Sequence, residues 1–213
     1  MHARPRAASA PRLVEESDGE EYPHRTAWAV VIPQLEHGET NPTGSFYDDL
    51  VAMVFAFHAM EGYLNFIGGK ITPDLWADER TTFKNTGLTG KLEAICERCG
   101  MSMPDKGRRP YQTVSGLKEL RTRMAHPKII EVRSRVEFAA DKLPPIFRKS
   151  YPANLVSHER ALRARDDVKW LADEIHKAAV ARFPHAAPEL GLDALSGIHS
   201  RRTWSTRLAH PDG

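Results

Sequence analysis

Cysteine is scarce in this sequence, and no signal for secretion is visible. Cys96 and Cys99 are the only two cysteines in 213 residues, which is too few for a small secreted scaffold held together by disulfides. No apolar stretch precedes the acidic cluster of residues 15–21, whereas a secretory signal peptide needs one. We therefore expect a reduced protein that is located in the cytoplasm.

An apolar run free of charge is also missing. The most apolar segment, residues 46–67, carries Asp48, Asp49 and Glu61, and each carboxylate is costly in the hydrocarbon of a bilayer. This segment is expected to be a helix of the protein core, and no membrane partner is expected.

Patterns of metal ligands are lacking as well. The CxxC spacing of Cys96 and Cys99 has no second cysteine pair or histidine pair to complete a zinc site. Two cysteines on the inward side of a helix are more often part of the core. We expect no metal and no other cofactor.

The composition that remains is that of an ordinary globular protein. Apolar residues make up 41% of the chain and charged residues 27%, and the net charge is only +2, as in a single domain with tails. The charge is unevenly distributed, because residues 105–149 contain 12 Lys or Arg against 5 Asp or Glu. Such an excess suits a phosphate-bearing partner, although most charge runs are solvated faces.

Apolar residues recur at helical spacing in five segments. The first ends at Gly68-Gly69, the fourth ends at His126 because Pro127 disfavours the helical conformation of the residue before it, and the last is capped by Ser157. The predicted helices cover residues 45–67, 73–83, 88–101, 114–126 and 158–183. They predict a mostly α fold, an antiparallel bundle of about five helices.

Two further segments are predicted to be extended. Residues 28–32 are apolar and end at Pro33, as in a lead-in strand or turn, and a loop is expected over residues 36–44. Residues 130–138 alternate between apolar and charged side chains, which predicts a short β excursion after the fourth helix. The expected organisation is a disordered tail (1–25), a helical domain (26–183) and a C-terminal tail (184–213).

Arg121 and His126 form a pair suited to the cleavage of a phosphodiester bond. A guanidinium binds phosphate oxygens and stays charged, and an imidazole exchanges protons near neutral pH. RNA supplies its own nucleophile, the 2′-hydroxyl, so a metal is not required. The spacing also arises by chance, and the ordinary interpretation is a salt bridge from Arg121 to Glu119 or Glu61 and an exposed histidine at a helix end.

The positions of the two residues on the helix set a condition on this site. Arg121 and His126 lie about 140° apart around a regular helix, so they do not stack as residues four apart do. A shared site needs the reach of Arg121, unwinding at Pro127 or a second copy of the chain. A twofold dimer would gather two arginines and two histidines in one cleft, and a homodimer is therefore expected.

The segment Leu120–His126 resembles the Arg-x4-His signature of HEPN domains, usually written Arg-Asn-x-x-Ala/Val-His. Residues 59–65 resemble the first long helix of that family, which carries an acidic residue inside an apolar stripe. Residues 90–95 and 110–113 match the order seen in bacterial members. The resemblance covers residues 45–183 and implies that Arg121 and His126 are catalytic.

The resemblance also implies supporting roles for other residues. Glu61 corresponds to the group that orients Arg121 through a partly buried ion pair. Thr122 departs from the family pattern, which commonly has Asn there, and its hydroxyl cannot offer both a donor NH₂ and a carbonyl. Apart from the resemblance, the local excess of basic residues makes Arg108, Arg109, Arg123 and Lys128 the residues expected to contact RNA.

Three functions are compatible with these residues. The resemblance implies a metal-independent endoribonuclease that cleaves RNA by attack of the 2′-hydroxyl, as in toxin–antitoxin or phage-defence systems, with an antitoxin or regulatory protein as a further partner. The alternative is a non-catalytic HEPN-like module that binds RNA, a nucleotide or a protein. The third is a helical homodimerisation domain without a nucleic-acid role, which the basic excess disfavours.

Overall fold

The protein forms two compact units. The computed structural model describes residues 13–41, 43–126 and 154–208. The helical unit is Pro23–Gly197, and the other unit combines the two ends of the chain, Met1–Tyr22 and Ile198–Gly213. Each unit is described by itself below.

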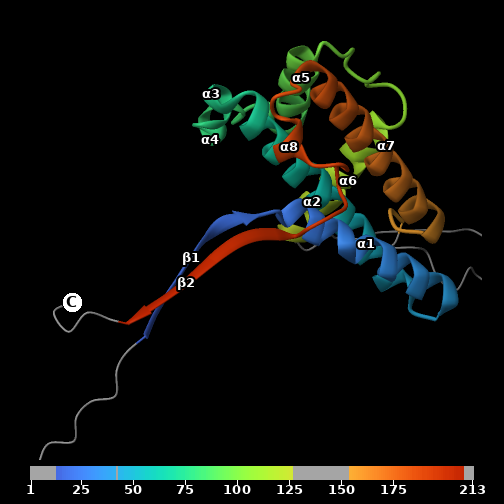
Figure 1. Cartoon of the computed structure of the whole chain (residues 1–213). Coiled ribbons are helices and arrows are strands. Elements are labelled where there is room, and N and C mark those ends of the chain that lie inside the picture. The colour runs from blue at the N-terminus through green and yellow to red at the C-terminus, as the bar shows by residue number, and fades with distance from the viewer. Residues whose placement is uncertain (1–12, 42, 127–153, 209–213) are drawn as a thin grey trace, which may run out of the picture. The chain divides into compact units, whose positions relative to one another are not determined.

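Within the described residues, the helical unit contains eight helices (Figure 1). They are α1 Pro23–Thr40, α2 Ser45–Ile71, α3 Pro73–Trp76, α4 Glu79–Thr82, α5 Gly87–Cys99, α6 Tyr111–Ala125, α7 His158–Arg182 and α8 Ala187–Leu190. Helix α2 packs against α1, α3, α5, α6 and α7 and is therefore the central helix. The prediction of a mostly α fold with a short β element is confirmed.

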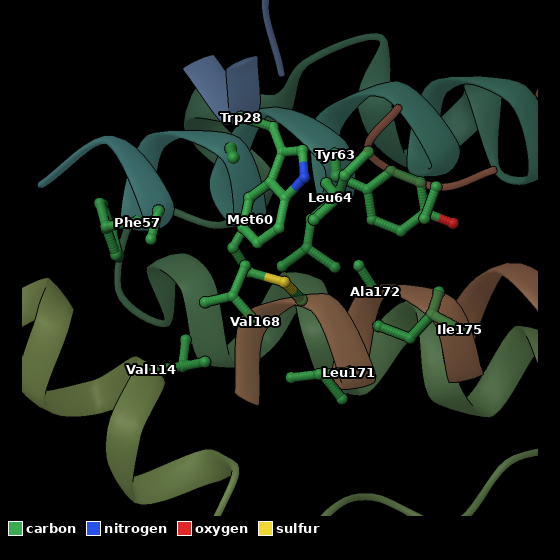
Figure 2. Packing of buried hydrophobic residues seen from close by; sticks show 14 of the residues in the cluster. Trp28, Phe57, Met60, Tyr63, Leu64, Val114, Val168, Leu171, Ala172 and Ile175 are labelled. Atoms are coloured by element: carbon green, nitrogen blue, oxygen red, sulfur yellow. The ribbon is translucent and has the colours of Figure 1, made fainter. Parts of the chain in front are cut away.

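The core lies where α2 meets α7 (Figure 2). Met60, Tyr63 and Leu64 of α2 and Leu171 and Ile175 of α7 have no exposed surface. Burying a large apolar side chain contributes about 1.5–3 kcal/mol, so this contact supplies a large part of the stability of the unit. The three- and four-residue spacing in the sequence identified both faces.

Helix α2 is also long and apolar enough to cross a membrane by length and composition. Half of its apolar window is buried within the chain, which is the burial expected of the central helix of a bundle. The alternation of buried and half-buried residues along α2 matches its packing against α1 on one side and α7 on another.

Helix α1 replaces the short strand and most of the loop that the sequence predicted before the first long helix. Trp28, Val31 and Leu35 are spaced by three and four residues and are buried, and α1 packs extensively on α2. Pro33 lies inside this helix with its ring exposed. The burial of the apolar stripe therefore outweighs the backbone hydrogen bond that Pro33 cannot donate.

Helix α2 does not stop at Gly68-Gly69, as predicted, but continues to Ile71. Thr72 ends it, with both its backbone N–H and its hydroxyl donating to the Gly68 carbonyl, at 2.8 and 2.9 Å. A Cβ atom at Gly68 would lie 2.2 Å from the indole of Trp76. This glycine permits close packing and does not terminate the helix. The single helix predicted after it is two short ones, α3 and α4.

The C-terminal end of α6 and the N-terminal end of α7 lie where the sequence predicted them. Helix α6 ends at Ala125, and His126 caps it with its N–H bonded to the Thr122 carbonyl at 3.1 Å. Helix α7 begins after Ser157, whose hydroxyl accepts from the Arg160 N–H at 3.4 Å. The extended segment predicted at residues 130–138 lies outside the described residues.

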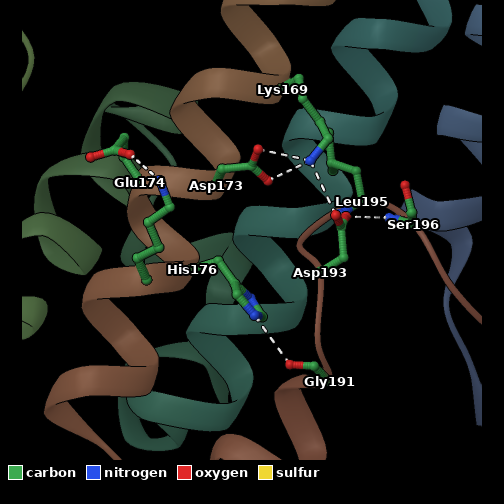
Figure 3. A network of polar contacts seen from close by, with 9 residues as sticks. Lys169, Asp173, Glu174, His176, Gly191, Asp193, Leu195 and Ser196 are labelled. Atoms are coloured by element: carbon green, nitrogen blue, oxygen red, sulfur yellow. Dashed lines mark hydrogen bonds and ion pairs between the residues drawn. The ribbon is translucent and has the colours of Figure 1, made fainter.

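The chain after α7 returns along the helical unit and is held there by polar contacts (Figure 3). Lys169 binds Asp173 at 2.7 Å and Asp193 at 3.2 Å. His176 Nε2 donates to the Gly191 carbonyl at 3.1 Å, and the Arg25 guanidinium donates to the Leu190 carbonyl at 3.2 Å. We call this set the C-terminal clamp: Arg25, Lys169, Asp173, His176 and Asp193.

The second unit is an antiparallel two-stranded ribbon of β1 Leu13–Glu21 and β2 Ser200–Leu208. For the segments that form β1 and β2, the sequence predicted an N-terminal and a C-terminal tail. Five carboxylates of β1 run beside three arginines of β2, with Glu20 opposite Arg201 and an ion pair between Glu21 and Arg202. Cross-strand pairs of opposite charge stabilise a sheet, so complementary charge explains a ribbon that local apolar patterns do not indicate.

Candidate functional site

His126 lies at the surface where α6 ends. Its backbone leaves the helical conformation, with φ −128° and ψ 63°, and its side chain is exposed. Among the described residues, no hydrogen bond or ion pair involves its imidazole. The imidazole is therefore accessible to a ligand from solvent.

Arg121 is half-buried on the same helix. Neither salt bridge considered from the sequence is found among the described residues: Glu119 pairs with Arg123 instead, and no ion pair joins Arg121 to Glu61. Within that part of the chain, the charge of Arg121 has no carboxylate partner.

The register between α2 and α6 explains why Glu61 and Arg121 do not meet. Near the end of α6, Leu117 and Leu120 line a cavity together with Met53 of α2. Glu61 follows Met53 by two helical turns, about 12 Å along the helix. The sequence correctly placed Glu61 at the edge of the apolar stripe of α2, since Glu61 is half-buried. The register between α2 and α6 depends on tertiary packing, so the sequence did not show that Glu61 and Arg121 lie apart.

The remaining predicted residues lie in different surroundings. Arg108 is exposed and pairs with Asp105 at 3.5 Å. Thr122 is exposed on α6, and its carbonyl accepts the capping N–H described above. Arg123 is exposed and bound to Glu119. Lys128 lies outside the described residues.

Arg109 is fixed at the start of α6 by an acidic residue of α7. Its guanidinium donates two hydrogen bonds of 2.8 Å to the two carboxylate oxygens of Asp167, and the Thr113 hydroxyl donates to the same carboxylate at 2.5 Å. These hydrogen bonds raise the pKa of Arg109 further above its usual value. Bidentate pairs of this kind fix geometry as well as charge, so Arg109 ties α6 to α7.

A cavity of about 350 Å³ that no pattern in the sequence predicts opens between α2, α6 and α7. Its lining combines apolar side chains with three arginines and one glutamate. The lining residues are Met53, Arg109, Gln112, Thr113, Gly116, Leu117, Glu119, Leu120, Leu155, Arg160, Arg163 and Ala164. Ten of them belong to α2, α6 and α7, and Arg109 and Leu155 lie just before α6 and α7. Because these segments are far apart in the chain, no motif search could group them.

One face of α6 connects this cavity with the predicted site. Gln112, Gly116, Glu119, Arg123 and His126 are spaced by four, three, four and three residues, which places all five on one face of the helix. The first three line the cavity. At 100° per residue, His126 lies about 20° beyond Glu119 at one margin of the lining residues of α6, and Arg121 lies about 40° beyond Leu117 at the other margin.

Cys96 and Cys99 are buried on α5, as expected for core residues. Burial is the main cause that raises the pKa of each thiol to about 11, so both thiols stay protonated at neutral pH. In the described ranges, no three His, Cys, Asp or Glu side chains are grouped so that they could hold a metal ion.

No protein-family model, curated protein or solved structure matches this chain. The resemblance to HEPN domains therefore stands on the residues and spacings given above.

Proposed function

We propose that this protein is a metal-independent endoribonuclease of the HEPN type, with His126 and Arg121 as its catalytic residues. The observation that carries the proposal is the exposed imidazole of His126 at the end of α6, on a helix face that continues into an arginine-lined cavity. An exposed histidine is suited to proton transfer on a bound polyanion.

The chemistry requires only groups that the chain and RNA provide. His126 removes the proton of the 2′-hydroxyl, the 2′-oxygen forms a bond to phosphorus, and the bond from phosphorus to the 5′-oxygen breaks. The 5′-oxygen leaves with a proton from a second acid. Arg121 binds the non-bridging oxygens and offsets their charge in the transition state. The products carry a 2′,3′-cyclic phosphate and a 5′-hydroxyl.

The proposal includes a homodimer, because Arg121 and His126 lie on separate flanks of α6. In a twofold dimer, the arginine of one copy reaches the phosphate held at the histidine of the other, and the second His126 is available as the acid. Sedimentation velocity at the concentrations used for activity tests this step. A dimer is expected, and an active monomer would exclude the composite site.

A second candidate function is a non-catalytic module that binds RNA or a protein. Two observations favour it: Thr122 takes the place of the Asn in the family signature, and no interaction joins Arg121 to His126 among the described residues. The two functions make opposite predictions for cleavage, because a binding module retains RNA intact.

The experiment that separates them measures cleavage of a mixed RNA substrate by the wild-type chain, His126→Ala and Arg121→Ala, with and without EDTA. His185→Ala is the matched control, because His185 is an exposed histidine elsewhere in the helical unit. We expect His126→Ala to lower the rate about 10²–10⁴-fold, EDTA and the control to leave it unchanged, and Arg121→Ala to lower it as well. Cleavage that survives both substitutions contradicts the proposed site.

A role as a toxin or phage-defence component that acts on cytoplasmic RNA is part of the proposal. Expression in a bacterial host is expected to arrest growth, and His126→Ala is expected to relieve the arrest. An antitoxin or regulatory protein would then be sought by its ability to restore growth with the wild-type chain.

A further inference from the structure

Among the described residues, Arg160 and Arg163 of α7 bring positive charge to the cavity and have no carboxylate partner that is buried in it. Arg160 donates to the Asn154 carbonyl at 2.8 Å, which is a neutral acceptor. Arg163 pairs with Glu159 at 2.5 Å, but 80% of the Glu159 side chain is exposed, so solvent weakens that pair. Arg109, by contrast, donates two hydrogen bonds to Asp167, whose side chain is only 11% exposed. Arg160 and Arg163 are therefore the arginines available to an anion.

Part of the cavity lining is apolar and consists of Met53, Leu117, Leu120, Leu155 and Ala164. Gln112, Thr113 and Glu119 also line the cavity, and Glu119 is paired with Arg123. The volume of about 350 Å³ lies at the lower end of the range of small-ligand pockets, about 300–1,000 Å³. A ligand that fits the apolar part and the arginines has an apolar body and an anionic group, and guanidinium groups bind phosphate oxygens bidentately.

The position of the cavity relative to His126 points to the source of such a ligand. Glu119 lines the cavity, and His126 follows it on the same face of α6 by seven residues, about 10 Å along the helix axis. Arg123 lies between them on that face. A group bound in the cavity is thus a near neighbour of a phosphate held at His126.

We propose that this cavity binds one nucleotide of the RNA strand, next to the phosphate that is cleaved. Arg160 and Arg163 bind its phosphate, and the apolar lining contacts its base. Arg109 is a positioning residue that acts through Asp167 to hold α6 against α7. This proposal rests on the ribonuclease function. A free nucleotide offers the same chemistry, so the test distinguishes the two sources.

The binding experiment uses the full chain carrying His126→Ala, so that RNA is not consumed. Fluorescence anisotropy measures the affinity for a labelled short RNA and its displacement by adenosine 5′-monophosphate. Arg160→Ala and Arg163→Ala are added together. Arg182→Ala serves as the control, because Arg182 is an exposed arginine of the same helix outside the cavity.

The expected result is a loss of affinity for RNA by about tenfold or more in the double variant, with a salt dependence of log K that is shallower by about one to two. The control is expected to change the affinity by less than about twofold. Equal affinity of the double variant and its parent would overturn the proposal. Arginine-dependent binding of the mononucleotide without binding of RNA would overturn the RNA source and assign the cavity to a free nucleotide.

A cleavage assay keeps the failure of this proposal separate from the failure of the ribonuclease function. In the otherwise wild-type chain, the double variant is expected to raise KM with little change in kcat, because the cavity binds a non-reacting part of the substrate. If the double variant cleaves RNA with a normal KM, the proposed nucleotide site in the cavity is rejected and the ribonuclease function is retained. Absence of cleavage in the wild-type chain, with arginine-dependent RNA binding, rejects catalysis and retains the cavity as an RNA site.

Discussion

The helical unit holds charge in two different arrangements. In the C-terminal clamp, Lys169 is bound by two carboxylates, and Asp193 also accepts the N–H groups of Leu195 and Ser196. In the cavity, Arg160 and Arg163 have a neutral or a solvated partner. Charged side chains that are paired with opposite charges in the chain stabilise the fold. Charged side chains whose partners are neutral or solvated are available to a ligand.

The largest expected effect concerns acid, and it arises beside the clamp at His24. This residue is 1% exposed and is stacked on Phe66 with ring centroids 4.9 Å apart. Burial, and then the charge of Arg25, lower the pKa of His24 from 6.5 to about 4. Between these values the unfolded chain binds a proton that the folded chain does not, so the free energy of unfolding falls as the pH falls. The loss reaches about 3 kcal/mol near pH 4.

Urea unfolding at a series of pH values between 6.5 and about 4 measures this slope. Burial also lowers the pKa of His176, so its contribution has the same sign. His24→Phe keeps an aromatic ring and removes the titrating group, and we expect it to flatten the pH dependence. An unchanged slope in this variant would show that His24 is not the cause.

The next effect is smaller and lies in the clamp itself. Asp193→Ala removes the acceptor of two backbone N–H groups and a partner of Lys169, and we expect a loss of about 1–2 kcal/mol in the free energy of unfolding. Urea unfolding at neutral pH measures it. Asp193→Asn keeps one carbonyl acceptor and is expected to lose less. Equal stability of Asp193→Ala and wild type would show that the contacts of Asp193 in the C-terminal clamp do not stabilise the helical unit.

Acid is expected to weaken the same contacts at a lower pH. Burial alone would raise the pKa of Asp193, but the N–H groups of Ser196 and Leu195 and the ammonium of Lys169 outweigh it and lower the pKa below 3.8. A carboxylate with a lowered pKa stabilises the folded chain above its unfolded value and loses that contribution as the pH falls through the folded value. The wild-type chain is therefore expected to lose the stabilising contribution of Asp193 as the pH falls below about 3.8. Asp193→Ala lacks this contribution at every pH.

The smallest effect on stability is expected at the cavity. Arg160→Ala and Arg163→Ala remove charges whose partners are neutral or exposed, and such surface substitutions usually change stability by less than about 0.5 kcal/mol. The same urea experiment measures this. If either variant loses as much stability as Asp193→Ala, the distinction between the two arrangements of charge is wrong.

The sequence predicted the parts of this molecule that are set by local pattern. The apolar spacing located α2, α5, α6 and α7, and Pro127 located the end of α6. Helix α1 was missed because Pro33 resembles a helix stop when its buried stripe is not taken into account. The ribbon was missed because it pairs residues such as Glu20 and Arg201 across almost the whole chain.

The candidate site was predictable to the same limited extent. His126 at an exposed helix end follows from the residues around it, and so does the separation of Arg121 from it around the helix. The relation of His126 to the cavity depends on how α2 and α7 lie against α6, which is a property of tertiary packing. The spacing of Gln112, Glu119 and His126 is visible in the sequence, but only the cavity shows that this face matters.

The most direct test of the central claim is to identify the ends of the RNA fragments that the wild-type chain produces. The substrate is a single RNA strand and, in parallel, the same strand with a 2′-deoxy nucleotide at the cleaved position. We predict fragments with a 2′,3′-cyclic phosphate from the first and no cleavage at that position in the second. Cleavage of the deoxy position, or a 3′-hydroxyl end on the fragments, would contradict attack by the 2′-hydroxyl and with it the role assigned to His126.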